Sequence, residues 1–277
     1  MSSLKSQNPL TGEVLKEFNT WTEDEIKQAV EKSWEAFQKY KDTDIDSKTE
    51  KFQKLVSVLE ENREKYAKLI TLEMGKTITS ARAEVDRCAS YCKYYSKNAH
   101  EFLKKQKIPS SAPDSYVIYQ PLGPLITVMP WNYPFWLPFK AIIPQLLLGN
   151  TVLMKNASNI PQCGMELEKC FREAGFDEGV YQYAPVAASD LEKVVSNDKI
   201  RGASITGSTP AGKSFAELCG KYLKKCVLEL GGADPFIVLE DADLDKAAKL
   251  AVKSRMSTGA QACTNAKRFI IREEVYD

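Results

Sequence analysis

Histidine and net charge are both scarce in this 277-residue sequence. Its one histidine, His100, argues against a multi-histidine metal site and against a serine-histidine-aspartate triad, so we expect no metal cofactor. The 38 Lys and Arg residues balance the 37 Asp and Glu residues. That balance gives no electrostatic signal for nucleic acid or for an anionic membrane. The composition therefore favours a small-molecule partner.

Long uninterrupted apolar runs and a secretory hydrophobic region are lacking as well. The apolar stretch 121–149 is interrupted by several prolines and by Asn132 and Lys140, which a transmembrane helix would not tolerate. The first residues are polar and charged rather than apolar. We therefore expect no membrane segment and a cytoplasmic, reducing location.

The seven cysteines fit that expectation. Six of them are spaced four or seven residues apart within helical patterns, as the pairs Cys88/Cys92, Cys163/Cys170 and Cys219/Cys226. A reduced thiol on one face of a helix packs as a small apolar side chain. We expect these six in the core, with no disulfides and no metal cluster.

The first third of the chain reads as helices. Thr22 and Glu25 form a capping-box pattern ahead of a helical apolar period, which predicts a helix starting near Thr22. A second predicted helix runs from near Asp46 to Gly75, and a third spans 77–103. We expect the three helices to form one packed layer.

In the middle of the chain, short apolar runs alternate with helical patterns. Strands are predicted at 125–129, 151–155, 180–184, 202–206 and 226–230, and helices at 135–148, 161–174, 189–196 and 210–223. This alternation predicts an α/β fold with a parallel, doubly wound sheet. Such sheets bind ligands beyond the carboxyl ends of their strands, here at 130–132, 155–158 and 207–209.

One of these turns has the form of an anion site. Thr206, Gly207 and Ser208 follow a predicted strand, and Pro210 occupies the first turn of the next helix. A helix N-terminus offers free N–H groups to a diphosphate. Plain capping by Ser208 explains the same residues, and the stretch does not match the G-x-G-x-x-G pattern. Both interpretations stay open.

Two further side chains are candidates for chemistry. Cys263 lies among small and polar residues rather than on an apolar helical face, a setting that permits a reactive thiolate. Glu229 ends an apolar strand, where desolvation would raise its pKa toward that of a general base. Exposure of Glu229 at the strand terminus is an equal alternative.

An ordered set of motifs connects these pieces. In chain order they are Leu72-Glu73-Met74-Gly75-Lys76, Met129-Pro130-Trp131-Asn132-Tyr133-Pro134, Gly149-Asn150-Thr151-Val152-Leu153-Met154-Lys155, Thr206-Gly207-Ser208, Leu228-Glu229-Leu230-Gly231-Gly232 and Gln261-Ala262-Cys263. The set resembles the aldehyde dehydrogenase family over nearly the whole chain. The stretches 224–238 and 266–270 are most similar to the bacterial succinate-semialdehyde dehydrogenase branch.

The resemblance implies a mechanism through a covalent thiohemiacetal. Cys263 would attack the aldehyde, and the amide of Asn132 with the backbone N–H of Cys263 would hold the oxyanion. Glu229 would then activate water to hydrolyse the thioester. For the distal carboxylate of succinate semialdehyde, Arg255 is the candidate cation, and a surface arginine at a helix end is the alternative.

The resemblance also implies a nicotinamide cofactor in a Rossmann-like domain. Lys155 would bind the adenosine ribose, Ser208 the diphosphate, and Trp131 would form part of the floor beneath the cofactor. Met129, Gly207 and Leu230 complete the expected cofactor site. NAD-selective relatives often carry Glu at the position of Ser158, which repels a 2′-phosphate, so we expect NADP or NAD here, with a preference for NADP or dual use.

The sequence departs from the family pattern in two places. Ala260 stands where the family has glycine before the nucleophile, which would strain the loop if that position needs positive φ. Asp277 follows Cys263 by 277 − 263 = 14 residues, whereas family members continue to nearly twice this length. We therefore expect a cofactor-binding domain at 1–230, with a strand excursion near 109–123, and the beginning of a truncated catalytic domain at 231–277.

Two functions follow from this reading. The first is NAD(P)-dependent oxidation of succinate semialdehyde, by a chain whose longer form would be a homo-oligomer. The second is a non-catalytic nucleotide-binding or subunit-interaction fragment that assembles through its strand at 115–119. The first predicts turnover, and the second predicts cofactor binding without turnover.

Overall fold

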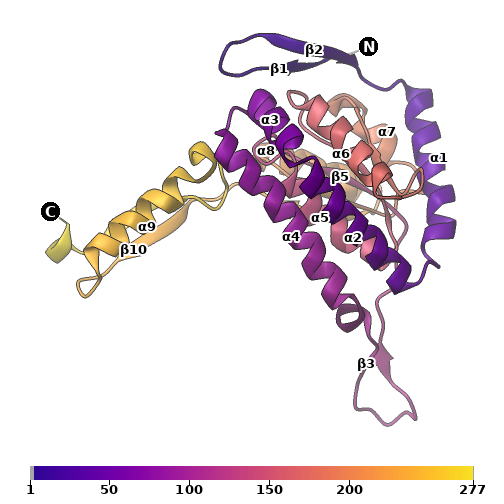
Figure 1. The fold of residues 1–277 in the computed structure, drawn as a ribbon. Coiled ribbons are helices and arrows are strands. Elements are labelled where there is room, and N and C mark those ends of the chain that lie inside the picture. Colours follow the sequence, from indigo (N-terminus) through magenta and orange to yellow (C-terminus); the bar gives the residue numbers. More distant parts are fainter. Residues whose placement is uncertain (1–2, 277) are drawn as a thin grey trace.

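A computed structural model describes residues 3–276 (Figure 1). The strands are β1 (Ser3–Gln7), β2 (Val14–Asn19), β3 (Gln106–Lys107), β4 (Tyr116–Val117), β5 (Pro124–Val128), β6 (Thr151–Lys155), β7 (Tyr181–Tyr183), β8 (Gly202–Thr206), β9 (Lys225–Glu229), β10 (Asp234–Val238) and β11 (Ala266–Ile271). The α-helices are α1 (Glu23–Tyr40), α2 (Ile45–Glu61), α3 (Arg63–Met74), α4 (Ile78–Leu103), α5 (Trp136–Leu148), α6 (Pro161–Glu173), α7 (Leu191–Val195), α8 (Thr209–Lys221) and α9 (Leu244–Met256). Short 3₁₀ turns lie at Ala188–Asp190, Ser257–Ala260 and Glu273–Val275.

The central sheet is parallel throughout and has the order β7-β6-β5-β8-β9. Helices connect its strands in sequence, so the predicted doubly wound α/β architecture is confirmed. The predicted strands 151–155 and 202–206 have the observed bounds of β6 and β8. β5 comes first in sequence among the strands of this sheet and lies between β6 and β8, so the direction of winding reverses between β5 and β8.

Helices cover both faces of this sheet. Apolar residues of α5 and α6 pack on one face, and those of α1, α7 and α8 share a second cluster with β5, β6 and β8 on the other. Helices α2, α3 and α4 form an outer layer against α5 and α6. The prediction of one layer for all the N-terminal helices is therefore wrong for α1, which packs against β5, β6, β7 and α7.

The predicted helix from Asp46 to Gly75 is two helices. It breaks at Asn62, whose φ of −99° and ψ of 13° end α2, and whose side-chain amide donates to the carbonyl of Val58 at 3.0 Å. The apolar period continues across the break, since Leu59 and Tyr66 are both fully buried. Periodicity alone therefore predicted one helix where the backbone turns.

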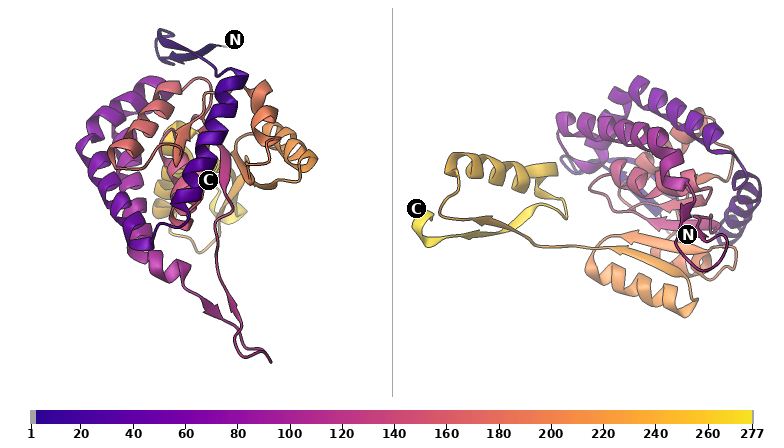
Figure 2. Two further views of the ribbon diagram at one scale, coloured as in Figure 1. Left: turned by 90° about the vertical axis from the view of Figure 1, so that its right-hand side faces the viewer. Right: turned by 90° about the horizontal axis from the view of Figure 1, so that it is seen from below.

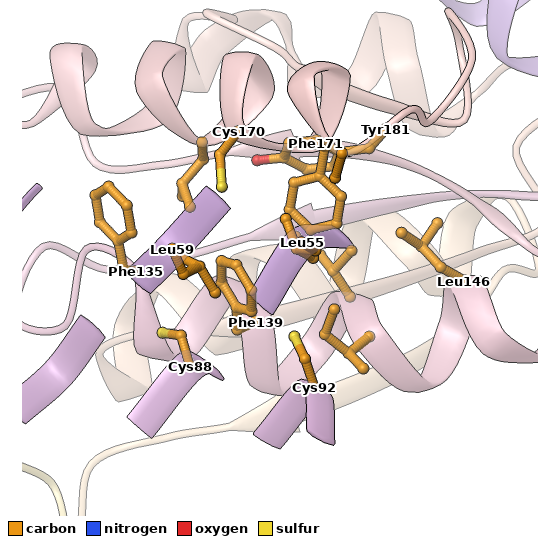
Figure 3. Packing of buried hydrophobic residues seen from close by; sticks show 14 of the residues in the cluster. Leu55, Leu59, Cys88, Cys92, Phe135, Phe139, Leu146, Cys170, Phe171 and Tyr181 are labelled. Atoms are coloured by element: carbon orange, nitrogen blue, oxygen red, sulfur yellow. The ribbon is translucent and has the colours of Figure 1, made fainter. Parts of the chain in front are cut away.

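The main core lies between the outer helical layer and the sheet (Figure 3). Phe171 contacts Tyr181, with ring centroids 4.4 Å apart, while Cys88, Cys92 and Cys170 fill the space between larger side chains. Among the six cysteines expected in the core, Cys88, Cys92, Cys163, Cys170 and Cys219 are buried, and Cys226 is half-buried. All seven cysteines lie in the described part of the chain, and each is a free thiol.

Two hairpins project from this body. The antiparallel pair β1 and β2 has no counterpart in the sequence-based prediction, because its strands alternate charged and half-exposed residues and bury only Leu4 and Ser6. The pair β3 and β4 extends away from the helices (Figure 1) and includes the strand predicted at 115–119. Within residues 3–276, no helix is long and apolar enough to cross a bilayer.

The C-terminal elements β10, α9 and β11 form an arm that extends away from the body (Figure 2). β10 and β11 pair in parallel, and α9 packs along them. Phe269 and Ile270, on β11, keep about half of their surface exposed. Lys267 and Arg268 donate to the carbonyls of Gly232 and Ala233, which fastens the arm to its connecting segment.

Candidate active site

The carboxyl ends of four sheet strands meet at one edge. The N–H of Met129, after β5, donates to the carbonyl of Lys155 at 2.7 Å, and the N–H of Gly207, after β8, donates to the carbonyl of Glu229 at 3.0 Å. β5 and β8 pair directly with each other. The expected ligand segments therefore lie together where the winding reverses, the position at which doubly wound sheets bind their ligands.

Helix α8 starts at this edge. Ser208 is its N-cap and its hydroxyl accepts from the N–H of Ala211 at 3.4 Å, so the capping interpretation of this turn is confirmed. Leu230 packs closely against the first turns of α8. A Cβ atom added to Gly212 would lie only 2.4 Å from the Cδ2 atom of Leu230. Glycine at 212 thus permits the close contact between α8 and the segment after β9.

The other expected cofactor residues lie at the ends of β5 and β6. The ammonium of Lys155 donates to the carbonyl of Asn156 at 3.1 Å, and burial lowers the pKa of this lysine. Trp131 is 38% exposed, and Ser158 is exposed in the turn after β6. A lysine, an open aromatic face and a hydroxyl are thereby available at one edge.

Asn132 joins the body to the loop that carries Cys263. Its side-chain Nδ2 donates to the carbonyl of Gln261 at 2.6 Å, two residues before Cys263. Its Oδ1 is buried without a hydrogen-bond partner among the described residues. Cys263 itself is exposed. The structure thus brings the predicted oxyanion residue and the predicted nucleophile loop together from positions 129 residues apart.

The segment 258–263, which we call the nucleophile loop, has an unusual backbone. Thr258, Gly259 and Ala260 have φ values of 52°, 61° and 65°. Ala260 therefore has positive φ at the place where the family has glycine, and the strain expected there is present. Left-handed conformation costs an L-residue about 1 kcal/mol.

Asn265 supports this loop and was missed by the sequence reasoning. Its side-chain amide donates to the carbonyls of Ser254, Arg255 and Ser257, and its Oδ1 accepts from the N–H of Ala262 at 2.8 Å. The residue is 1% exposed. The sequence signal was only an Asn two residues after a candidate nucleophile, and neither its burial nor its hydrogen-bond partners can be predicted from that.

Glu229 is exposed at the end of β9 rather than desolvated, as the second of its two interpretations had it. Its side chain is 60% exposed, and the Nζ of Lys140, on α5, lies 3.9 Å from its Oε1. Both residues line a cavity of about 500 Å³ between α5 and the strands β5, β8 and β9. Lys140, like Asn265, is a functional candidate that the sequence analysis missed, because it lies within an apolar run.

Arg255, the cation expected to meet a substrate carboxylate, lies at the end of α9. Its guanidinium donates to the carbonyl of Ala260 at 3.3 Å. The arginine therefore contacts the strained part of the nucleophile loop from the side of the arm.

Comparison with known proteins agrees with this geometry. A sequence model of the aldehyde dehydrogenase family matches residues 2–277. A probable succinate-semialdehyde dehydrogenase (NADP+) of Synechocystis is 42% identical over 97% of this chain and 59% of its own length. Succinate-semialdehyde dehydrogenase (NADP+) 1 of Mycobacterium tuberculosis is 39% identical over 98% of this chain and 60% of its own length.

Among solved structures, succinic semialdehyde dehydrogenase from Streptococcus pyogenes, in complex with NADP+, superimposes with a TM-score of 0.96 at 33% identity, covering 99% of this chain and 60% of that one. The chain thus spans about 60% of the length of the curated relatives it matches. Because the family model matches nearly the whole sequence and the fold superimposes on that of a solved member, the chain belongs to the aldehyde dehydrogenase family.

Proposed function

We propose that this chain carries the cofactor-binding part and the nucleophile loop of an enzyme that oxidises aldehydes, with succinate semialdehyde as substrate. The observation that carries the proposal is the 2.6 Å hydrogen bond from Asn132 Nδ2 to the carbonyl of Gln261. It connects the amide needed at a developing oxyanion to the loop that bears Cys263. The names of the Synechocystis and mycobacterial relatives support the choice of substrate.

The first step is the addition of Cys263 to the aldehyde. The thiolate sulfur forms a bond to the carbonyl carbon, and the π electron pair moves to oxygen. The Asn132 amide carries two N–H donors, so one can hold Gln261 while the other donates to the oxyanion, together with the backbone N–H of Cys263. The oxyanion then re-forms the carbonyl as the carbon gives up its hydride, which a bound nicotinamide would accept, and a thioester remains on Cys263.

The second step is hydrolysis. Glu229 takes a proton from water, the hydroxide adds to the thioester carbon, and the Cys263 thiolate leaves as the carboxylate forms. The carboxylate of Glu229 is accessible to water, and the ammonium of Lys140 lies 3.9 Å from it. Lys140 also lines the cavity, where it can form an ion pair with the distal carboxylate of the substrate.

The residues at the sheet edge fit a nicotinamide dinucleotide. Lys155 is a partly buried cation that forms no ion pair with any carboxylate of residues 3–276, so its donors suit ribose hydroxyls or phosphate. The N-terminus of α8, capped by Ser208, supplies N–H donors, and Trp131 supplies an aromatic face. NADP or NAD, when bound, supplies the hydride acceptor. Ser158 lacks the carboxylate that would repel a 2′-phosphate, which supports NADP.

The test is to measure NADPH or NADH formation by the 277-residue chain with succinate semialdehyde, alongside cofactor binding by fluorescence. Turnover supports the aldehyde-oxidising function. Cofactor binding without turnover, in a chain whose circular dichroism shows it to be folded, would instead support the second candidate, a nucleotide-binding fragment that assembles through the β3–β4 hairpin. If the chain shows neither cofactor binding nor turnover, both candidate functions are contradicted.

Replacing Lys140 with Met is expected to raise the KM for succinate semialdehyde about tenfold or more, since a charged hydrogen bond is lost. The KM for butanal, which has no carboxylate, should change little. Arg255→Met is the matched comparison, because the sequence analysis named Arg255 as the candidate cation. A selective rise in KM for Arg255→Met, with none for Lys140→Met, would reverse the assignment. Steady-state kinetics with both aldehydes make this distinction.

A further inference from the structure

A buried ion pair lies behind Asn132. The Nζ of Lys76 and the Oε2 of Glu84 are 2.5 Å apart, and the two side chains are 1% and 0% exposed. Removing both charges from water is costly, and such a pair is weak grounds for stability by itself. Its other contacts therefore indicate what the pair does.

The pair holds both ends of the turn that leads into α5. Lys76 also donates to the backbone carbonyl of Asn132 at 2.9 Å, and its ammonium lies 4.2 Å from the ring centroid of Tyr133. Glu84 Oε1 accepts from the N–H groups of Phe135 at 2.8 Å and Trp136 at 3.0 Å. The pair, which belongs to the α3–α4 connection and to α4, thus fixes the backbone on both sides of residues 133 and 134.

Helix capping alone explains Glu84 but not Lys76. Glu73, at the end of α3, caps α6 in the same way, because its carboxylate accepts from the N–H groups of Gln162 at 3.0 Å and Cys163 at 2.8 Å. Glu73 is 1% exposed and forms no ion pair with any described lysine or arginine. A buried carboxylate can therefore cap a helix here without a cation. The cation at α5 adds the contact to the Asn132 carbonyl.

On its other side, Asn132 faces the nucleophile loop through the hydrogen bond to Gln261. The backbone of this residue is thus held by Lys76 while its amide is aimed at the loop. We propose that Lys76 and Glu84 are positioning residues, which set the Asn132 amide for the oxyanion formed at Cys263. This inference rests on the proposed function and extends it to two residues that touch neither substrate nor cofactor.

The experiment measures how well succinate semialdehyde protects Cys263 from iodoacetamide, with labelling at Cys263 quantified by mass spectrometry. Protection reports the covalent adduct and needs no turnover. The variants are Asn132→Ala, the neutral pair Lys76→Met with Glu84→Gln, and the three changes combined. Gln at 84 keeps an oxygen that can accept from α5, so this pair is the variant best able to fold. Lys51→Met, which removes the half-exposed ion pair with Asp177, is the matched control.

We expect the aldehyde concentration for half-protection to rise about tenfold in Asn132→Ala and by a similar factor in the neutral pair. The combined variant should show no further rise, because both changes remove one interaction. Labelling without aldehyde should keep its rate, since alkylation forms no oxyanion; a merely structural defect would change that rate. The control should match the unchanged chain.

Three outcomes would overturn the inference. Unaltered half-protection in the neutral pair, beside a clear shift in Asn132→Ala, would leave Lys76 and Glu84 purely structural. Fully additive shifts would show that the pair acts elsewhere. Absence of protection in the unchanged chain would remove the proposed function of this chain and the inference with it. This third outcome can be distinguished from the first two, because the aldehyde then fails to protect Cys263 even in the unchanged chain.

Discussion

Serine in place of Cys263 is expected to lower the rate of aldehyde oxidation by at least about 10³-fold. A serine hydroxyl stays protonated at neutral pH, and the exposed side chain at 263 has no hydrogen-bonded base beside it in the described structure that could remove the proton. Sulfur is also a far stronger nucleophile than a hydroxyl oxygen. The measurement is NADPH formation under saturating succinate semialdehyde, together with cofactor binding, which should not change.

Cys226→Ser is the control for that substitution. Cys226 is a half-buried thiol on β9 with no assigned part in the reaction. We expect Cys226→Ser to retain turnover. Equal loss in both variants would mean that general damage, rather than removal of the nucleophile, explains the result. Retained turnover in Cys263→Ser would refute the assignment of the nucleophile.

Replacing Glu84 with Leu is expected to lower the free energy of unfolding by about 3–5 kcal/mol, because it leaves the buried ammonium of Lys76 without its counter-charge. The N–H groups of Phe135 and Trp136 lose their acceptor in the same step. Single domains are stable by only about 5–15 kcal/mol, so the loss should be visible as a large shift of the urea midpoint.

The matched control for this prediction is Glu60→Leu. Glu60 pairs with Lys93 at 2.7 Å between α2 and α4, but both side chains are more than half exposed. An exposed ion pair contributes about 1 kcal/mol or less, so this variant should unfold close to the unchanged chain. Comparable losses in the two variants would show that burial does not set the cost of breaking the Lys76–Glu84 pair.

Local signals predicted local structure well. Thr22 and Glu25 indicated a helix start, and in the structure their side chains bond reciprocally to each other's backbone. The strand 202–206 followed from an apolar run between turn residues, and β8 has these bounds. In both places the determining interactions lie within a few residues, so the sequence around them was sufficient.

Predictions that depended on tertiary contacts failed or were not available. The apolar stripe of α1 indicates that one face is buried, but not that it packs on the sheet face opposite to α2–α4. The sequence analysis assigned no role to Lys76 or Glu84, because the contact of Lys76 with Asn132, 56 residues away, is visible only in the fold. The candidate residues Cys263, Glu229 and Asn132 were predicted through the ordered motifs, whereas Asn265 and Lys140 could be proposed only from the fold.

The separation of arm and body bears on how often a complete site exists. Cys263 belongs to the arm, and Asn132 and Glu229 belong to the body, so the proposed mechanism requires the contact between the arm and Asn132. We expect only molecules in which that contact is formed to react. The observed rate is then the intrinsic rate multiplied by that occupied fraction. A tenfold change in the fraction corresponds to about 1.4 kcal/mol, the scale of one hydrogen bond. We therefore expect substitutions in the connecting segment 231–233 to change turnover, although these residues have no proposed contact with a reacting atom.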